Sequence, residues 1–222
     1  MMAFYASRII QILPYFLKGL LMTIEVSGIS LILSTVLGFV LGILRTADSK
    51  LITRSIGVYV DVMRGTPFVV QIFIVFFILP SWGLQLEPLS AAILALTAMT
   101  AAFICEVVSG GIKAVPKGQW EAAAASGLTR MQQLRLVILP QSMQTILPPL
   151  VGQYVLMIKD SSVVSVIGVT ELTRVGWQTV VRIPEGLMVF TLVGILYFVI
   201  CYPLIRLSNY LEHRLSMQAV KL

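Results

Sequence analysis

The sequence is poor in charge. Only 12% of its 222 residues are Asp, Glu, Lys or Arg, whereas a soluble domain carries about 25%. Hydrophobic residues make up 58% of the chain, and the mean hydropathy is +0.94. These values exclude an ordinary soluble domain and indicate an integral membrane protein.

Cysteine and histidine are also scarce. Cys105 and Cys201 lie inside apolar runs far apart in the sequence, so we interpret them as buried small hydrophobic side chains. His213 is the single histidine, and the apolar runs hold no paired carboxylates. We therefore expect no metal site, no catalytic residues and no membrane-embedded enzyme.

Two familiar motifs are missing. No phosphate-binding loop of the form G-x-x-x-x-G-K-[ST] occurs, so the chain cannot hydrolyse ATP by that route. The N-terminal region lacks the small-residue pattern of a cleaved signal peptide, and we expect the first apolar run to direct insertion itself.

The basic residues that give the net charge of +6 are scattered at the ends of apolar runs. That distribution favours a topogenic role over nucleic-acid binding.

Five apolar segments are each long enough to cross a hydrocarbon core of about 30 Å as a helix. The sequence therefore predicts an all-α protein with a single transmembrane domain over residues 1–222. Charged residues and Pro67 interrupt the second segment, and we expect Pro140, Pro148 and Pro149 to kink or split the fourth. The predicted spans are Gly19–Leu44, Gly57–Leu79, Leu89–Ile112, Val137–Ile158 and Gly186–Leu207.

The basic residues predict the orientation of these spans. Segments 45–56, 113–136 and 208–222 fall on one side of a five-helix arrangement. With their flanking residues they hold eleven of the sixteen basic residues, and the other side holds five. The positive-inside rule then places the N-terminus outside and the C-terminus in the cytoplasm. On the outer side, Lys159–Glu185 is expected to form a short interfacial helix.

Small residues recur every fourth position along the first span, at Ser30, Ser34, Gly38 and Gly42. Such a stripe lets another helix approach closely. The partner helix can belong to the same chain or to a second subunit, and the spacing favours neither. Since five helices make a thin wall around a pathway, we expect a second copy or a homologous subunit.

The predicted cytoplasmic segment 113–136 contains a short helix of small residues. Alanine and glutamate favour the helix from Glu121, and Gly127 is expected to end it. We expect Glu121 to cap or pair at the N-terminus of this helix. A small-faced helix between membrane spans suits docking into a partner's groove.

This segment carries a family resemblance. Glu121-Ala122-Ala123, then Gly127, then Val137-Ile138-Leu139-Pro140 after nine residues resembles the coupling motif of permease subunits in bacterial ATP-binding-cassette (ABC) importers. Further motifs resemble the polar amino-acid branch (histidine, glutamine, arginine, cystine and opine type), and the resemblance runs from Leu17 to Tyr210. These motifs are Arg64-Gly65-Thr66-Pro67, Gly110-Gly111-Ile112, Gly118-Gln119-Trp120-Glu121, Leu139-Pro140-Gln141 and Lys159-Asp160-Ser161-Ser162.

The resemblance implies a type I importer (MetI-like) permease fold in the bacterial cytoplasmic (inner) membrane, and a pathway for a polar amino acid. It implies two ATPase subunits that bind ATP and Mg, a second permease subunit (the same or a homologue) and an extracytoplasmic substrate-binding protein. The surrounding membrane lipid is a further partner, and this chain itself needs no cofactor. Alternatives are a permease for an opine or amino-acid-derived compound, or a secondary transporter, which would need its own ion site and usually internal repeats.

The candidate site residues fall into three groups. The coupling group is Glu121, Ala122, Ala123, Ala124, Gly127 and Leu128, and the helix-packing group is Ser34, Gly38 and Gly42. The pathway or gate candidates are Arg64, Thr66, Glu106, Glu25, Lys159, Asp160 and Ser161.

Arg64 and Glu106 are charges within spans, so we expect them to pair with each other or to face an aqueous cavity. A gate or substrate contact and a structural ion pair are both open. Glu25 either lines the pathway or snorkels to the outer interface. Ser109 replaces a basic residue that relatives often carry, which weakens any transfer of substrate identity.

Overall fold

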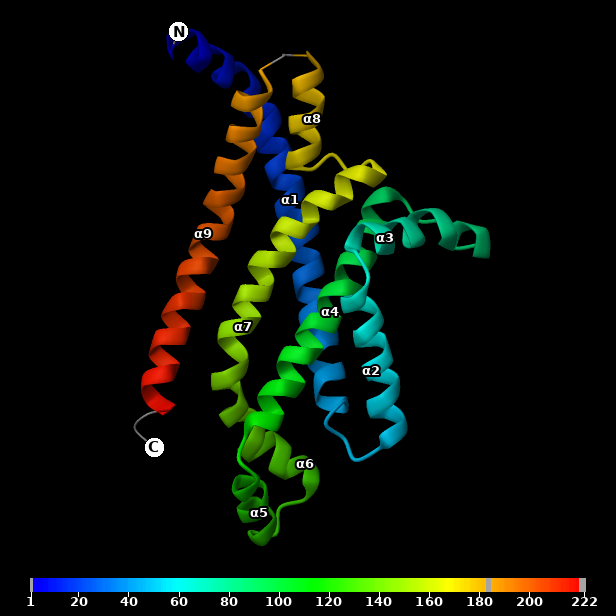
Figure 1. Ribbon diagram of the computed structural model, residues 1–222, viewed down its shortest axis with the longest axis vertical. Helices are drawn as coiled ribbons and strands as arrows, with labels where there is room; N and C mark the ends of the chain where they lie inside the picture. The colour runs from blue at the N-terminus through cyan, green and yellow to red at the C-terminus, as the bar shows by residue number, and fades with distance from the viewer. Residues whose placement is uncertain (1, 183–184, 220–222) are drawn as a thin grey trace. The chain divides into compact units, whose positions relative to one another are not determined.

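The computed structural model describes residues 2–182 and 185–219, and the side chains of 11–182 and 185–215. Every regular element in these residues is a helix, as predicted (Figure 1). The α-helices are α1 (Met2–Leu44), α2 (Lys50–Gly65), α3 (Phe68–Phe73), α4 (Pro88–Ala114), α5 (Lys117–Ala125), α6 (Arg130–Gln132), α7 (Leu139–Asp160), α8 (Leu172–Arg182) and α9 (Gly186–Ala219). Two π-helices, η1 (Ile74–Ile78) and η3 (Gln133–Ile138), and two 3-10 helices, η2 (Leu79–Trp82) and η4 (Ser161–Ile167), complete the described elements.

Four helical stretches are long and apolar enough to span a membrane, and a broken pair of helices supplies a fifth candidate. The predicted five segments correspond to these stretches, although the helices extend beyond the predicted boundaries. The four are Gln11–Leu44, Pro88–Ala114, Arg130–Ile167 and Gly186–Leu215, and the pair is Lys50–Gly65 with Phe68–Trp82.

The second predicted span, Gly57–Leu79, is not one continuous helix. Its helix begins earlier, at Lys50, and ends at Gly65, where Thr66 adopts an extended conformation with φ −117° and ψ 146°. Pro67 explains the break, because proline disfavours helical backbone in the preceding residue and has no N–H to donate. A new helix, α3, starts directly after the proline.

The fourth predicted span is not split. Helix α7 runs through Pro148 and Pro149, which deprive the carbonyls of Gln144 and Thr145 of their helical donors. Gln144 and Thr145 line a cavity of about 490 Å³, together with the two prolines and residues of α9. Backbone that lacks its helical bond is tolerated at membrane depth where it faces such a cavity.

The chain forms two compact units, each made of three stretches of sequence. Unit 1 comprises Met1–Ile32, Pro67–Thr97 and Leu156–Tyr202, and unit 2 comprises Leu33–Thr66, Ala98–Val155 and Pro203–Leu222.

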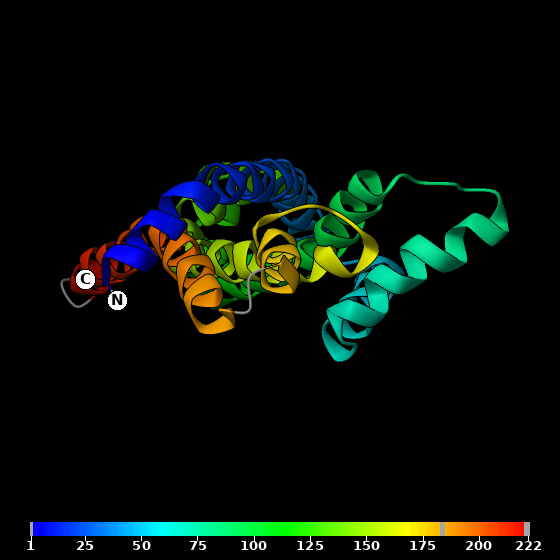
Figure 2. The ribbon, with the colours of Figure 1, turned by 90° about the horizontal axis from the view of Figure 1, so that it is seen from above.

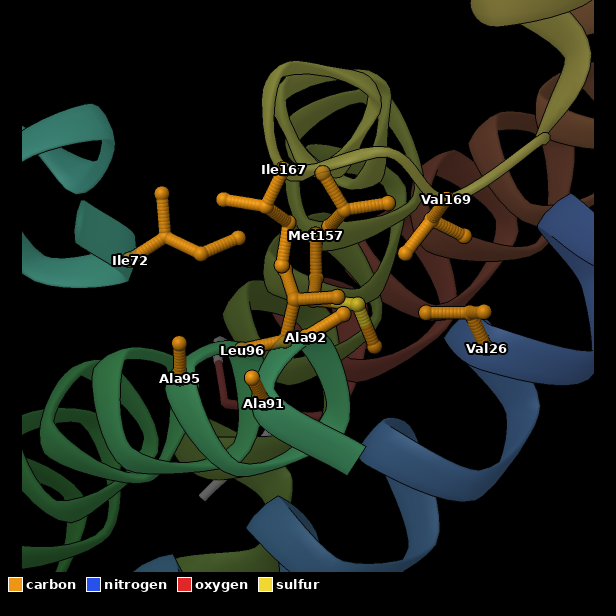
Figure 3. Packing of buried hydrophobic residues seen from close by; sticks show 10 residues of the cluster. Val26, Ile72, Ala91, Ala92, Ala95, Leu96, Met157, Ile167 and Val169 are labelled. Carbon is orange, nitrogen blue, oxygen red and sulfur yellow. The ribbon is translucent and has the colours of Figure 1, made fainter. Parts of the chain in front are cut away.

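Unit 1 has two apolar cores. The first joins residues of α1, α3, α4 and α7 with the chain after η4, and Figure 3 shows Val26, Ile72, Leu96 and Met157 pointing toward one another. The second joins α1, α8 and α9. Helix α8 stands beside α1 in Figure 1 and is seen along its axis in Figure 2. The short helix predicted in Lys159–Glu185 is therefore present as α8.

Unit 2 also has two apolar cores. One joins α4 and α7 around Ile104, Ile112 and Ile146, and the other joins α2 and α4 around Val60 and Ala102.

The small residues of the first span pack within the chain. Ser34 is fully buried. A Cβ atom at Gly38 would lie 2.6 Å from Cβ of Ile104, and one at Gly42 would lie 2.6 Å from Cβ of Val108. Both contacts join α1 to α4 inside unit 2, so the structure favours intrachain packing at these glycines over a subunit interface.

Gly38→Ala is expected to destabilise the protein, because the added methyl group overlaps Ile104 and overpacking costs about 1–3 kcal/mol. The matched control is Gly28→Ala on the same helix, where a Cβ meets no atom within 4 Å. Thermal unfolding of the purified full chain in detergent measures both. Equal midpoints for the two variants would contradict the close α1–α4 approach.

Candidate functional site

Helix α5 begins earlier than its sequence suggests. Pro116 precedes the first turn with extended backbone, and Lys117 is the first helical residue. Glu121 is thus the fifth residue of the helix, beyond the first turn, and its side chain is exposed. The prediction that Glu121 caps the N-terminus of this helix is wrong, because Pro116 holds the capping position and the helix begins at Lys117, four residues before Glu121.

Gly127 ends this region of helix as predicted. Its φ is +78°, in the left-handed range that glycine adopts at little cost. The N–H of Gly127 donates to the carbonyl of Ala124 at 3.0 Å, and the N–H of Leu128 donates to the carbonyl of Ala123 at 3.3 Å. This pair of bonds is a Schellman motif, which satisfies the last carbonyls of a helix and turns the chain sharply.

Most of the exposed residues in the C-terminal half of α5 are small. Ala122, Ala124 and Gly127 are exposed beside Glu121, whereas Ala123 is buried and anchors the helix to the rest of unit 2. No side chain longer than a methyl group projects from the alanines. A groove on another protein can therefore approach the backbone of α5 closely.

Arg130 of α6 and Gln141 of α7 contact side chains of α5 within unit 2. The guanidinium of Arg130 lies 4.0 Å from the ring centroid of Trp120, a cation–π contact, and its Nη2 lies 3.9 Å from Oδ1 of Asp48. The Gln141 Nε2 donates to Oε1 of Gln119 at 3.0 Å. Gln141 belongs to α7, whereas Asp48 lies in the loop between α1 and α2 and is linked to α5 only through Arg130.

The return from α5 to α7 is also fixed by hydrogen bonds. The N–H of Thr129 donates to Oε1 of Gln132 at 2.9 Å, as in a capping box. Gln133 is buried, and its Nε2 donates to the carbonyl of Leu128 at 2.7 Å. Figure 1 shows α5 and α6 following one another between α4 and α7.

A charged cluster in unit 2 joins three helix regions. The Oε2 of Glu106, on α4, accepts from Nη1 of Arg45 at 2.5 Å and lies 3.0 Å from Nη1 of Arg64 on α2. Arg64 also lies over the ring of Phe103, 5.6 Å from its centroid. The expected pairing of Arg64 with Glu106 is confirmed, while its role as a gate stays a prediction.

Arg45 is the member of this cluster that sequence reasoning missed. Its position directly after α1 is typical of a topogenic charge, so pattern alone gave it no partner. Burial lowers the pKa of Arg45, but the hydrogen bond and the charge of Glu106 outweigh this and raise the pKa above its ordinary value. The guanidinium is therefore always charged beside the carboxylate.

The remaining pathway candidates are Thr66, Ser161, Glu25, Lys159 and Asp160. Thr66 donates its hydroxyl to the carbonyl of Val62 at 2.8 Å, and buried Ser161 donates to the carbonyl of Ile158 at 2.7 Å. Glu25 and Lys159 are exposed in unit 1, and Asp160 is half-buried there. In the described residues no ion pair joins these three side chains, so their roles as pathway residues stay predictions. Ser109 is buried on α4 and donates to the carbonyl of Glu106 at 3.3 Å.

Sequence reasoning also missed Glu171, a fully buried carboxylate in unit 1. It accepts from the N–H groups of Thr173 and Arg174 at 2.8 and 2.7 Å and from the hydroxyl of Tyr197 at 2.8 Å. Burial raises the pKa of Glu171, and these hydrogen bonds act in the opposite direction. An acidic residue just before an amphipathic helix was the available signal, because carboxylates favour helix N-termini.

Comparison with known proteins agrees with this arrangement. Residues 34–217 match the family of binding-protein-dependent transport system inner membrane components. The glutamine transport system permease protein GlnP of Escherichia coli is 34% identical over 218 residues, covering 97% of this chain and all of that protein. The L-cystine transport system permease protein TcyB of Bacillus subtilis is 32% identical, covering 94% of this chain and 89% of that protein.

Solved structures give the same fold. A crystal structure of an amino acid ABC transporter with histidines has a TM-score of 0.86 and 29% identity, covering 94% of this chain and 97% of that one. An inward-facing MetNI methionine ABC transporter has a TM-score of 0.77 at 21% identity, covering 91% of this chain and 97% of that one, and supports the fold alone. The chain belongs to the family of binding-protein-dependent transport system inner membrane components.

Proposed function

We propose that this chain is the permease subunit of an ATP-driven importer for a polar amino acid. The carrying observation is the group of exposed small residues at the end of α5, which Gly127 terminates, on a helix that is hydrogen bonded to α7 and contacts Arg130 of α6. The relatives named for glutamine and cystine transport, similar over nearly their whole length, support an amino-acid substrate.

In this proposal a separate ATPase subunit receives α5 in a groove. That subunit binds ATP and Mg, while this chain contributes the pathway and no cofactor. The complex has two ATPase subunits, a second permease subunit that is identical or homologous, and an extracytoplasmic protein that delivers the substrate. The complex sits in the bacterial inner membrane, with α5 and the C-terminus on the cytoplasmic side.

The contacts of α5 suggest how ATP binding is coupled to the pathway. Closure of the ATPase subunits moves α5 as a rigid body, since its C-terminal end is fixed by the Schellman motif. The Arg130–Asp48 contact and the Gln119–Gln141 hydrogen bond then carry the displacement toward α2 and α7. Each contact is exposed and contributes little to stability. In this proposal they transmit the movement of α5 and take no part in a chemical step.

We propose that the Glu106 cluster serves as a clamp on the pathway. It ties the segment after α1 and the end of α2 to α4 through one carboxylate. About two-fifths of the Glu106 side chain is exposed, so water reaches the cluster. The ion pairs of the clamp can therefore separate without leaving an unpaired charge in the hydrocarbon core.

The substrate is tested in the reconstituted complex with its ATPase subunits and binding protein. We expect ATP hydrolysis to be stimulated by one or a few members of a panel of polar amino acids and opines. Stimulation by none of them, with stimulation by an unrelated solute, would overturn the amino-acid assignment.

Gly127→Leu is expected to leave membrane insertion intact and to uncouple ATP hydrolysis from uptake. A non-glycine residue at φ +78° is strained by about 1–2 kcal/mol, which disfavours the sharp turn that fixes the end of α5. The ratio of substrate imported to ATP hydrolysed in proteoliposomes is the measurement.

Gly83→Leu is the matched control, since Gly83 has φ +88° and open space around it, outside the coupling segment. The same backbone strain there should lower stability without changing the ratio of uptake to hydrolysis. A normal ratio in the Gly127 variant would refute the coupling role.

Glu106→Gln is expected to raise substrate-independent ATP hydrolysis several-fold and to lower the free energy of unfolding by about 1–3 kcal/mol. The neutral amide weakens both arginine contacts and so loosens the clamp. ATPase assays without substrate and thermal unfolding measure the two effects. The control is Glu87→Gln, an exposed carboxylate in unit 1. Lower stability with unchanged basal hydrolysis would mean that the cluster is purely structural.

A further inference from the structure

A second site, unrelated to the coupling segment, lies in unit 1 between α1 and α8. It is a cavity of about 450 Å³ at the place where these two helices cross. Its described lining residues are Ile12, Tyr15, Lys18, Gly19, Met22, Thr170, Val175, Gln178, Thr179 and Arg182.

The polar part of this lining is suited to an anion. Lys18 and Arg182 supply two positive charges, and none of the described lining residues is acidic. No hydrogen bond or ion pair from the described part of the chain engages either side chain, and both are exposed. Gln178 and Tyr15 add uncharged donors. The site therefore offers several donors and no competing carboxylate.

The other part of the lining is apolar. Ile12, Met22 and Val175 contribute hydrocarbon surface beside the cations. A free inorganic anion would leave this surface unused, whereas an amphiphile covers both halves of the cavity. Only a ligand with an anionic head and a hydrocarbon tail matches the whole lining.

The cavity is preformed, because α8 is docked rigidly on α1. A Cβ atom at Gly19 would lie 2.8 Å from Cγ2 of Val175, so the helices are in close contact beneath it. The N–H of Leu172 donates to the hydroxyl of Thr23 at 3.1 Å, and Glu171 holds the next two N–H groups of α8. A ligand that binds here therefore does not lose free energy by ordering the contact between α1 and α8.

The outward surface of α8 indicates where the ligand comes from. Trp177 is 60% exposed and Val181 is 85% exposed, next to the charged Arg182. Tryptophan beside a basic residue is typical of a helix at the boundary between lipid and water. Phospholipid headgroups occupy that boundary, and anionic ones attract lysine and arginine there.

We propose that this cavity binds an anionic phospholipid, with Lys18 and Arg182 contacting the phosphate of the headgroup. Ile12, Met22 and Val175 contact the upper part of an acyl chain. Since α8 and α1 both contribute, the lipid joins the two helices of unit 1 and stabilises their crossing.

Native mass spectrometry of the full chain in detergent, titrated with phosphatidylglycerol or phosphatidylcholine, tests the proposal. We expect the first phosphatidylglycerol to bind about 25-fold more tightly than the first phosphatidylcholine, since each of the two basic residues at a membrane surface adds about a factor of five. The double variant Lys18→Gln/Arg182→Gln should lose this preference while keeping its thermal midpoint in lipid-free detergent.

The matched control is Lys50→Gln/Arg54→Gln, which removes two exposed basic residues of α2 and should keep the preference. Equal binding of both lipids by the unchanged chain would overturn the proposal. So would an undiminished preference in the Lys18/Arg182 variant or an equal loss in the control. Displacement of the lipid by inorganic phosphate at the same concentration would show a simple anion site instead and would likewise overturn it.

Discussion

The carboxylate of Glu106 is the contact on which unit 2 depends. It lies within a membrane-spanning helix, where an unpaired charge is costly, and it satisfies two guanidinium groups from other parts of the chain. Arg45 and Arg64 in turn have no equivalent carboxylate within the described cluster. The segments that carry these three charges are therefore held in one arrangement. In the same unit α1 also approaches α4 closely at Gly38.

Helix α5 is held to unit 2 by other side-chain contacts, while much of it stays exposed. Ala123 is buried, Trp120 and Gln119 contact other parts of unit 2, and the exposed residues from Glu121 to the end of the helix are alanines apart from Glu121 itself. Arg130 is central, since it contacts both the Trp120 ring and Asp48. The helix is thus attached firmly to its own chain and presents little side-chain bulk to another. That combination suits a connection that transmits force.

Sequence reasoning was most successful where one residue carries a strong local constraint. Gly127 ends α5 because only glycine adopts its backbone cheaply, and Arg64 pairs with Glu106 because charges in apolar spans need partners. It failed where the partner is distant in sequence or the role is ambiguous. The positive-inside rule explains the position of Arg45 whether or not it contacts Glu106, so the sequence pattern could not predict that ion pair. The position of Glu171 before an amphipathic helix signals a helix N-terminus, but only the packing of α1, α8 and α9 shows that its carboxylate is fully buried.

The proline pair in α7 has a mechanical consequence. Bending a regular helix stretches or breaks hydrogen bonds on its convex side, but at Gln144 and Thr145 those bonds are already missing. The helix is therefore least stiff there, and the adjacent cavity leaves room for the backbone to shift. Gln141, which is hydrogen bonded to α5, lies one turn away. A push that enters α7 at Gln141 will be absorbed first as a bend at this joint, so the two ends of the helix need not move by the same amount.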